Sequence, residues 1–158
     1  VSPSMLAEAR ARCPESERVR YFESDGLGVP DAAKDREYGL ILAIAVFIHC
    51  PKAVTEALVR DAFTLLAPGG VLRFQVGGDP ADTKGLPEAE VVEVAEENSR
   101  QIVQSVTDEQ RELIDAHYLG HHFGYDEFSA FLLETIPVEA EIYRPEPNNM
   151  FATVRKPV

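Results

Sequence analysis

Residues 38–76 contain the pattern that most constrains the fold: two apolar segments separated by a segment with helical spacing. The first apolar segment is Tyr38–Val46 (YGLILAIAV), and the second, Val71–Val76, follows Pro68-Gly69-Gly70. Between them, apolar residues recur every three or four positions, at Val54, Leu58, Ala62 and Leu65. Near-continuous apolar strands joined by a helix are typical of a parallel sheet that is covered on both faces. We therefore expect Tyr38–Val46 and Val71–Val76 to be neighbouring strands of an α/β fold that run in the same direction.

Shorter patterns on either side of this unit extend the α/β prediction. Upstream, Arg18–Ser24 reads as a short strand, and downstream, Asp126–Leu133 has the apolar face of a helix. The inward-facing residues of that helix are expected to be Phe128, Phe131 and Leu132. Val138–Ile142 alternates apolar and acidic residues, as a strand with one solvated face does. Met150–Lys156 follows after a connection too short for a crossover, so the last two strands should be antiparallel.

Composition limits the class of protein and its partners. The 158 residues carry a formal net charge of −12, and 45% of them are hydrophobic, which fits one globular domain. The sequence has no cluster of Lys and Arg suited to a phosphate backbone, so we expect no nucleic-acid partner. No apolar run approaches the ~20 residues of a membrane-spanning helix, so we expect no membrane partner. Cys13 and Cys50 are too few for a disulfide framework and indicate reduced thiols in a cytoplasmic protein.

Charge is uneven along the chain, and residues 79–115 hold eleven acidic against three basic side chains. Such a run is usually the solvated face of a helix. The alternative is an acidic lid that selects a cationic or amine substrate. Glu88–Val106 reads as a helix, and Thr107 with Gln110 suits the capping box of a further short helix. We expect a helical insertion, or cap, over residues 79–123.

In this order, the segments resemble the class I S-adenosylmethionine-dependent methyltransferases. Ser2–Arg10 (SPSMLAEAR) looks like the helix after the family's second strand, and Ser24-Asp25-Gly26 looks like the end of its third strand. Tyr38–His49 looks like its fourth strand, and Leu65–Phe74 looks like its L-x-P-G-G turn and fifth strand. The C-terminal hairpin is similar to the family's reversed last strand. The order and spacing of these segments, more than any one motif, carry the resemblance.

The resemblance implies a Rossmann-like, mostly parallel sheet with helices on both faces and a C-terminal antiparallel hairpin. It also implies an N-terminally truncated domain, roughly the C-terminal two-thirds of a typical one. The family's first two strands, its Gly-rich cofactor loop and the acidic residue for the ribose would all precede Val1. Without those strands, the strand that ends at Asp25 would expose unpaired backbone groups. We therefore expect either residues upstream of Val1, or an exposed sheet edge that is paired in a homodimer or in a rearranged sheet.

The cofactor that the resemblance implies is S-adenosyl-L-methionine. On its adenine side, Met5 would lie against the ring, an apolar contact with a flat surface. Asp25 would accept a hydrogen bond from the adenine amino group, and Gly26 and Leu27 would let the backbone approach closely. Taken alone, Asp25-Gly26 is a turn signal. The order of the surrounding elements favours the cofactor interpretation.

On the methionine side, the resemblance implies that Ala43 and Ile44 line the cofactor as the chain leaves the central strand. His49 stands where the family often has a histidine near the transferred methyl group. One interpretation is a catalytic general base, because imidazole titrates near neutral pH. The other is a buried, hydrogen-bonded histidine. Gly39 departs from the family, which usually has Asp after the aromatic position of Tyr38.

A loop before the C-terminal helix is rich in aromatic and histidine residues. Its members are Tyr118, His121, His122, Phe123 and Tyr125. The loop either packs the end of the sheet or lines an acceptor pocket at the carboxyl ends of the strands, where open α/β sheets bind ligands. The spacing of His117, His121 and His122 does not match a zinc site, so we expect no metal.

The sequence therefore favours S-adenosylmethionine-dependent methyl transfer to a small-molecule acceptor. One alternative is a degenerate, non-catalytic copy that acts through association with another chain. Another is a different doubly wound protein, such as a nucleotide-binding oxidoreductase. The antiparallel finish and the lack of a second βαβ half count against this last alternative.

Overall fold

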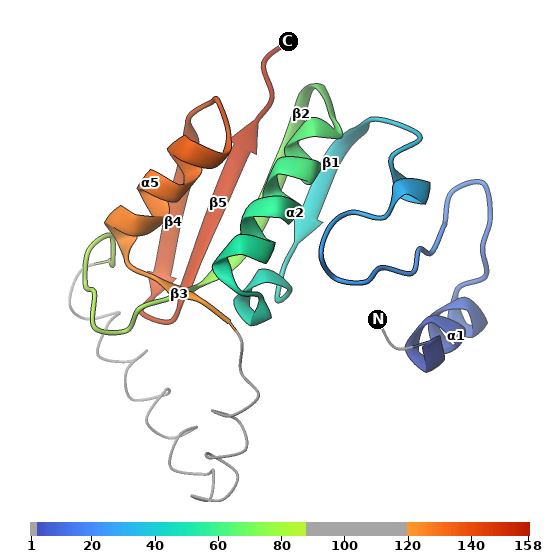
Figure 1. Ribbon diagram of the computed structural model, residues 1–158, viewed down its shortest axis with the longest axis horizontal. Coiled ribbons are helices and arrows are strands. Elements are labelled where there is room, and N and C mark those ends of the chain that lie inside the picture. Colours follow the sequence, from blue (N-terminus) through green and yellow to red (C-terminus); the bar gives the residue numbers. More distant parts are fainter. Residues whose placement is uncertain (1–2, 88–119) are drawn as a thin grey trace, which may run out of the picture.

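The computed structural model describes residues 3–87 and 120–158, which form one sheet with helices packed against it (Figure 1). Its helices are α1 (Pro3–Arg12), α2 (Lys52–Thr64) and α5 (Tyr125–Thr135). Its strands are β1 (Tyr38–Ala43), β2 (Leu66–Gly78), β3 (His122–Phe123), β4 (Ala140–Glu146) and β5 (Asn149–Arg155). Single 3₁₀ turns occur at Asp31–Ala33 and Phe47–His49.

The sheet has the strand order β1-β2-β5-β4, and the short β3 pairs with the end of β2. β1 and β2 are parallel, with Leu40 opposite Val71 and Ala43 opposite Phe74, so the central prediction is confirmed. The antiparallel hairpin of β4 and β5 is also confirmed. The sheet is mixed, not mostly parallel, because β5 pairs antiparallel with β2 as well as with β4.

The core lies between one face of the sheet and the helices α2 and α5. Phe74 on β2 is fully buried and meets Phe128 of α5 edge to face, with ring centroids 6.0 Å apart. Phe128 and Phe131 face inward, as predicted. On the α2 side, the buried residues are Thr55, Val59 and Ala62. Burial of a large apolar side chain such as that of Phe74 or Val59 contributes about 1.5–3 kcal/mol to folding.

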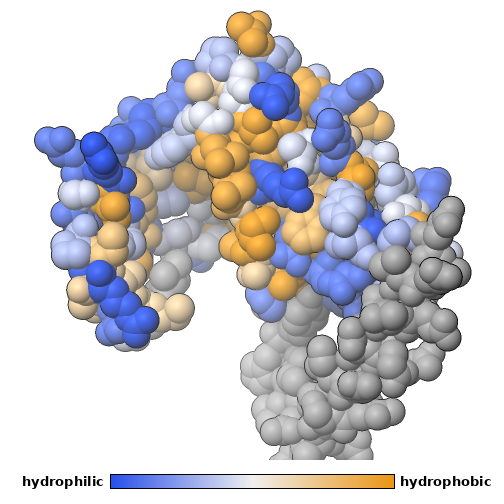
Figure 2. All heavy atoms as spheres, turned by 180° about the vertical axis from the view of Figure 1, so that it is seen from behind, coloured by the Kyte–Doolittle hydropathy of each residue, from blue (hydrophilic) through white to orange (hydrophobic). Residues whose placement is uncertain are grey.

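The prediction of helices on both faces is wrong for the part of the chain that the structure describes. α2 and α5 cover the same face, and α1 contributes no buried residue. The opposite face presents Leu40 and Leu42 of β1, which are 57% and 59% exposed, beside Arg73 of β2. Figure 2 shows the molecule from behind, so that this face is toward the viewer, with apolar side chains gathered near its centre among charged ones. We call it the open face.

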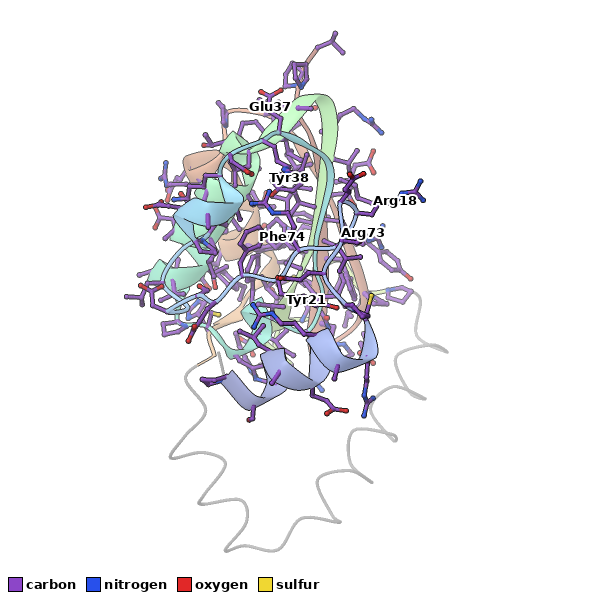
Figure 3. The ribbon with its side chains drawn as sticks, turned by 90° about the vertical axis from the view of Figure 1, so that its right-hand side faces the viewer. Arg18, Tyr21, Glu37, Tyr38, Arg73 and Phe74 are labelled. Carbon is purple, nitrogen blue, oxygen red and sulfur yellow. The ribbon has the colours of Figure 1, made fainter. Side chains whose placement is uncertain are left out.

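The predicted strand Arg18–Ser24 does not form, and β1 is therefore an edge of the sheet. The segment makes only an isolated bridge between Ser16 and Val19. Side chains hold it instead: Arg20 forms two hydrogen bonds with the carboxylate of Asp35, at 2.9 and 3.0 Å. A parallel strand needs a hydrogen-bonded neighbour, and this segment has none among the described strands. Figure 3 looks toward the β1 edge and shows Arg18 and Tyr21 on the segment that crosses in front of it.

The bounds of β1 and β2 differ from the prediction because of two irregular backbone positions. β1 ends at Ala43, not at Val46, because Ala45 turns the chain with a φ of 56°. β2 begins at Leu66 and contains Pro68-Gly69-Gly70 as an irregularity, with a register shift opposite β1. A Cβ on Gly70 would lie 2.8 Å from a carbonyl oxygen of its own strand, so this close approach requires glycine.

A buried arginine organises the other end of the sheet. β4 continues through Glu146, and Arg144 on this strand is 1% exposed. Its guanidinium donates hydrogen bonds to the carbonyl oxygens of Asp79 (2.6 Å), Pro147 (2.9 Å) and Lys84 (2.9 Å). Residues 79–87, the first part of the predicted helical insertion, form no helix or strand, and the hydrogen bonds from Arg144 hold their backbone in place. The helices predicted within residues 88–119 lie outside the described residues.

Adjacent leucines on α5 provide a test of this core. Leu132 is 3% exposed and Leu133 is 69% exposed. We expect Leu132→Ala to lower the free energy of unfolding by about 2–5 kcal/mol, because it removes apolar contacts and leaves a cavity. Leu133→Ala, the matched control, should change it by less than about 0.5 kcal/mol. Urea denaturation followed by circular dichroism measures both values, and equal effects would contradict the packing described here.

Candidate functional site

The carboxyl ends of β1 and β2 meet at one edge of the sheet, where open α/β sheets bind ligands. Beyond β1, the chain bends through residues 44–46 and enters the 3₁₀ turn Phe47–His49. At the end of β2, Gly77 and Gly78 pair with His122 and Phe123 of β3. A Cβ on Gly77 would lie 2.9 Å from the His122 ring, so glycine allows this histidine to approach. We call this region the carboxyl edge.

Three of the predicted site residues lie together at the carboxyl edge. Ala43 ends β1, Ile44 follows it with a 47% exposed side chain, and His49 ends the 3₁₀ turn. Between them, the backbone N–H of Ala45 donates a hydrogen bond to Oε1 of Gln75, at 2.9 Å. His49 is exposed, so the alternative of a buried histidine is wrong. Its catalytic role stays a prediction.

The residues predicted for the adenine side lie upstream. Asp25 accepts a hydrogen bond from the backbone N–H of Leu27 at 2.9 Å, and Gly26 has a φ of 82°. This confirms the turn that Asp25-Gly26 predicts. Met5 and Leu27 are 71% and 64% exposed. Figures 1 and 3 place α1, which carries Met5, toward the carboxyl end of β1 and away from the core. The role of these residues in cofactor binding stays a prediction.

A charged cluster at the carboxyl edge was missed by the sequence analysis. Oε1 of Glu127 is 2.6 Å from Nζ of Lys52 and 2.9 Å from Nε2 of His121. The backbone N–H of His121 donates to the carbonyl oxygen of Cys50, which joins the cluster to the turn after β1. Burial raises the pKa of Glu127, but the hydrogen bonds from Lys52 and His121 outweigh it, and the pKa lies below its ordinary value. The cluster therefore holds an ionised carboxylate beside an imidazole.

Some residues of the aromatic loop pack in the core, and others belong to the charged cluster of Glu127. Phe123 is 1% exposed and packs against Phe128 and Phe131, with centroid distances of 5.3 and 5.1 Å. His121 meets the Phe123 ring edge to face at 4.4 Å. Packing at the end of the sheet is therefore confirmed for Phe123, and the acceptor role of the loop stays a prediction. Tyr118 lies outside the described residues.

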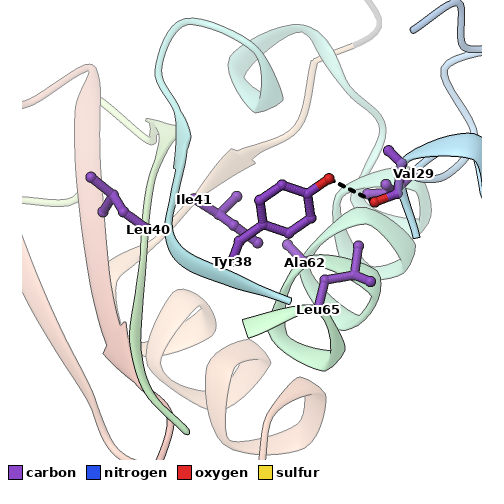
Figure 4. Close-up of a pocket in the computed structure, with 7 residues that line it drawn as sticks. Val29, Tyr38, Leu40, Ile41, Ala62 and Leu65 are labelled. Atoms are coloured by element: carbon purple, nitrogen blue, oxygen red, sulfur yellow. Dashed lines mark hydrogen bonds between the residues drawn. The ribbon is translucent and has the colours of Figure 1, made fainter. Parts of the chain in front are cut away.

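An apolar cavity lies at the opposite, amino end of β1 (Figure 4). Its volume is about 220 Å³, below the range usual for ligand sites. It is lined by Val29, Ala33, Tyr38, Leu40, Ile41, Ala62 and Leu65. The Tyr38 hydroxyl donates to the carbonyl oxygen of Ala33 at 2.7 Å and closes one side. Since ligands of open α/β sheets bind at the carboxyl edge, we do not assign the functional site to this cavity.

Two further properties apply to residues 3–87 and 120–158 only. Within them, no group of three or more His, Cys, Asp or Glu side chains could hold a metal ion. His117, from the histidine set considered above, lies outside these ranges. No helix in the same ranges is long and apolar enough to cross a membrane.

Comparison with known proteins places these features in a family context. Residues 1–70 match a family model described as a methyltransferase domain. The fold is similar to that of the DhpI–SAH complex, at 17% identity and a TM-score of 0.59, covering 99% of this chain and 64% of that one. It is also similar to an O-methyltransferase family protein from Burkholderia thailandensis, at 12% identity and a TM-score of 0.59, covering 98% and 42%. No curated protein sequence matches the chain.

A third similar structure is the N-methyltransferase NodS from Bradyrhizobium japonicum WM9 in complex with S-adenosyl-L-homocysteine. It is 16% identical with a TM-score of 0.54, and the match covers all of this chain and 64% of that one. The predicted resemblance to S-adenosylmethionine-dependent methyltransferases is thereby confirmed: residues 1–70 match the methyltransferase family model, and the described residues share the Rossmann-like fold of these structures. The chain spans 64% and 42% of the first two structures. The match of residues 1–70 to a methyltransferase family model favours the methyltransferase interpretation over the oxidoreductase alternative.

The lowered pKa of Glu127 gives a pH-dependent test of the charged cluster. A carboxylate whose pKa is lower in the folded protein stabilises it above the unfolded pKa, and this stabilisation is lost as pH falls through the folded pKa. We expect Glu127→Gln to be less stable than the unaltered protein at pH 7, and the difference to shrink between about pH 5 and pH 3. Denaturation midpoints measured across this range test the prediction.

Glu134→Gln is the matched control, because Glu134 is an exposed carboxylate on the same helix. The difference in denaturation midpoint between Glu134→Gln and the unaltered protein should stay small and nearly constant with pH. A Glu127→Gln difference that grew on acidification would contradict the ion-pair geometry.

Proposed function

We propose that this protein transfers a methyl group from S-adenosyl-L-methionine to a small-molecule acceptor. The observation that carries the proposal is the convergence of Ile44, His49 and the Glu127 cluster at the carboxyl edge of a methyltransferase-like sheet. The solved structures of similar fold include two complexes with the demethylated cofactor. A small molecule is the acceptor class because the net charge of −12 disfavours a nucleic acid.

The residues present fit the cofactor in chemical type. Met5 and Leu27 offer exposed apolar side chains for the adenine ring, and Asp25 offers a carboxylate oxygen for its amino group. Ala43 and Ile44 are apolar and lie at the end of β1, as the methionine chain requires. When bound, the cofactor supplies an activated methyl group on a sulfonium. The chain then has to orient the acceptor and accept its proton.

We assign proton removal from the acceptor to His49, which is exposed at the carboxyl edge. A hydroxyl or amine becomes a better nucleophile as its proton moves to the imidazole ring. His121 lies near the turn that carries His49, because its backbone N–H donates to the carbonyl oxygen of Cys50. Glu127 orients the imidazole of His121.

Both cysteines are free thiols, which supports the assignment to the cytoplasm.

Cofactor binding tests this proposal directly. We expect S-adenosyl-L-homocysteine to bind the protein in isothermal titration calorimetry and Asp25→Ala to weaken binding about tenfold, the effect of losing one hydrogen bond. Asp25→Asn keeps an acceptor oxygen and should weaken binding less. Asp31→Ala, at another exposed aspartate, is the control and should bind as the unaltered protein does. No binding by the unaltered protein would overturn the proposal.

A second candidate, association with another chain, is favoured by the contrast between the two edges of the sheet. Exposed edge strands usually carry charges or proline that prevent pairing. β4 does so, with Glu141, Pro145 and Glu146. β1 has none of these, and its exposed side chains are apolar. We propose that the partner is a second copy, whose β1 would pair antiparallel and remove both unprotected edges at once. α1 contributes no buried residue, and the segment that crosses in front of β1 would have to move aside.

Sedimentation velocity tests the homodimer. We expect a concentration-dependent dimer that Leu42→Lys converts to monomer, because a charge on β1 opposes pairing. Tyr143→Lys, an equally exposed position on β4, is the matched control and should leave the dimer intact. A monomer at every concentration of the unaltered protein would rule this candidate out.

A further inference from the structure

A chain of side-chain hydrogen bonds crosses the sheet and ends at the bend after β1. Oε1 of Gln75 on β2 accepts from the backbone N–H of Ala45 at 2.9 Å. Nε2 of Gln75 donates to Oδ1 of Asn149 on β5 at 2.5 Å. Nδ2 of Asn149 donates in turn to the carboxylate of Glu146 on β4. Three strands therefore contribute to holding one backbone group at the carboxyl edge.

The carboxylate fixes the direction of this chain. An ionised Glu146 only accepts hydrogen bonds, so Asn149 must turn its amide nitrogen toward it. The oxygen of Asn149 then faces Gln75, which must present its own nitrogen there. Gln75 is left with its oxygen toward Ala45, the orientation that a backbone N–H requires. The two amides are thus set in the orientation that serves Ala45.

Ala45 is the position where such support is needed. Its φ of 56° is the left-handed conformation, which side chains with a Cβ disfavour. Among the described residues, it is the only one other than glycine with a positive φ. Backbone in this conformation persists where its surroundings hold it, and such positions cluster at functional sites. Ile44 precedes it directly, and the turn that carries His49 begins two residues later.

We infer that Gln75 is a positioning residue for the carboxyl edge: its side chain holds residues 44–46 so that Ile44 and His49 present a fixed surface to the cofactor. This inference rests on the proposed function and deepens it. Gln75 lies on the open face of β2, level with the end of β1, and is half-buried. It acts through Ala45 and has no role in proton transfer. Its contribution is the orientation of a loop that would otherwise sample other conformations.

The experiment compares Gln75→Leu, which removes the acceptor, with Gln75→Glu, which retains an acceptor oxygen for Ala45. Arg73→Leu is the matched control, because Arg73 lies two positions earlier on the same strand and face. The first readout is the hydrogen-exchange rate of the Ala45 amide, measured by nuclear magnetic resonance. The second is the affinity for S-adenosyl-L-homocysteine, measured by calorimetry. A denaturation midpoint for each variant records whether it folds.

For Gln75→Leu we expect exchange at Ala45 to accelerate about tenfold and the affinity to fall five- to tenfold, the effect of one lost hydrogen bond. Gln75→Glu keeps the acceptor for Ala45 but loses the donor to Asn149, so it should restore only part of both values, and Arg73→Leu should change neither. If Gln75→Leu fails to fold, Asn149→Ala interrupts the same chain one link further from Ala45 and should show a smaller change of the same sign. A merely structural role would lower the denaturation midpoint without a selective effect at Ala45.

The outcomes separate this inference from the proposed function. Binding by the unaltered protein with equal affinity in Gln75→Leu overturns the inference and leaves the proposed function standing. Unchanged exchange at Ala45 in Gln75→Leu also overturns the inference. No binding by the unaltered protein overturns the proposed function, and the role of Gln75 at a cofactor site falls with it.

Discussion

The parallel pairing of β1 with β2 is the constraint on which the rest of this structure depends. It places the carboxyl ends of the two strands at one edge, so that the turn after β1 and Gly77-Gly78 at the end of β2 lie at the same edge. The pairing is possible because α2 returns the chain to the start of the sheet and packs its buried residues against β2. β5 then occupies the other side of β2, which fixes β2 at the centre. Every candidate functional group at the carboxyl edge is positioned by this arrangement.

The elements with a strong local pattern were predictable from sequence. Continuous apolar runs identified β1 and β2, and helical spacing identified the inward face of α5. For α2, the predicted stripe began at Val54 and Leu58, whereas the fully buried residues include Thr55 and Val59. The buried face is displaced by one position in the first two turns, whereas Ala62 is buried as predicted, because the fold as well as hydropathy sets the rotation of the helix. Thr55 is buried although its hydroxyl group lowers its apolar character.

The predictions that failed concern contacts between distant parts of the chain. Arg18–Ser24 has the local character of a strand, but a strand also requires a neighbour, which local pattern does not provide. The burial of Arg144 could not be predicted, because it depends on carbonyl oxygens about sixty residues earlier in the chain. Lys52 and Glu127 are 75 residues apart, so no spacing rule could join them. The family resemblance could place Ile44 and His49 after the strand β1, because both lie within six residues of its end, and their roles stay predictions.

The way Arg144 holds residues 79–87 has a consequence for how this protein can vary. Its guanidinium binds main-chain carbonyl groups of Asp79 and Lys84, and every amino acid carries such a group. The course of this segment is therefore largely insensitive to which side chains it bears at those positions. Substitutions there can alter the surface beside the carboxyl edge while the backbone keeps its path. A segment held in this way can change its surface through mutation without a matching loss of stability.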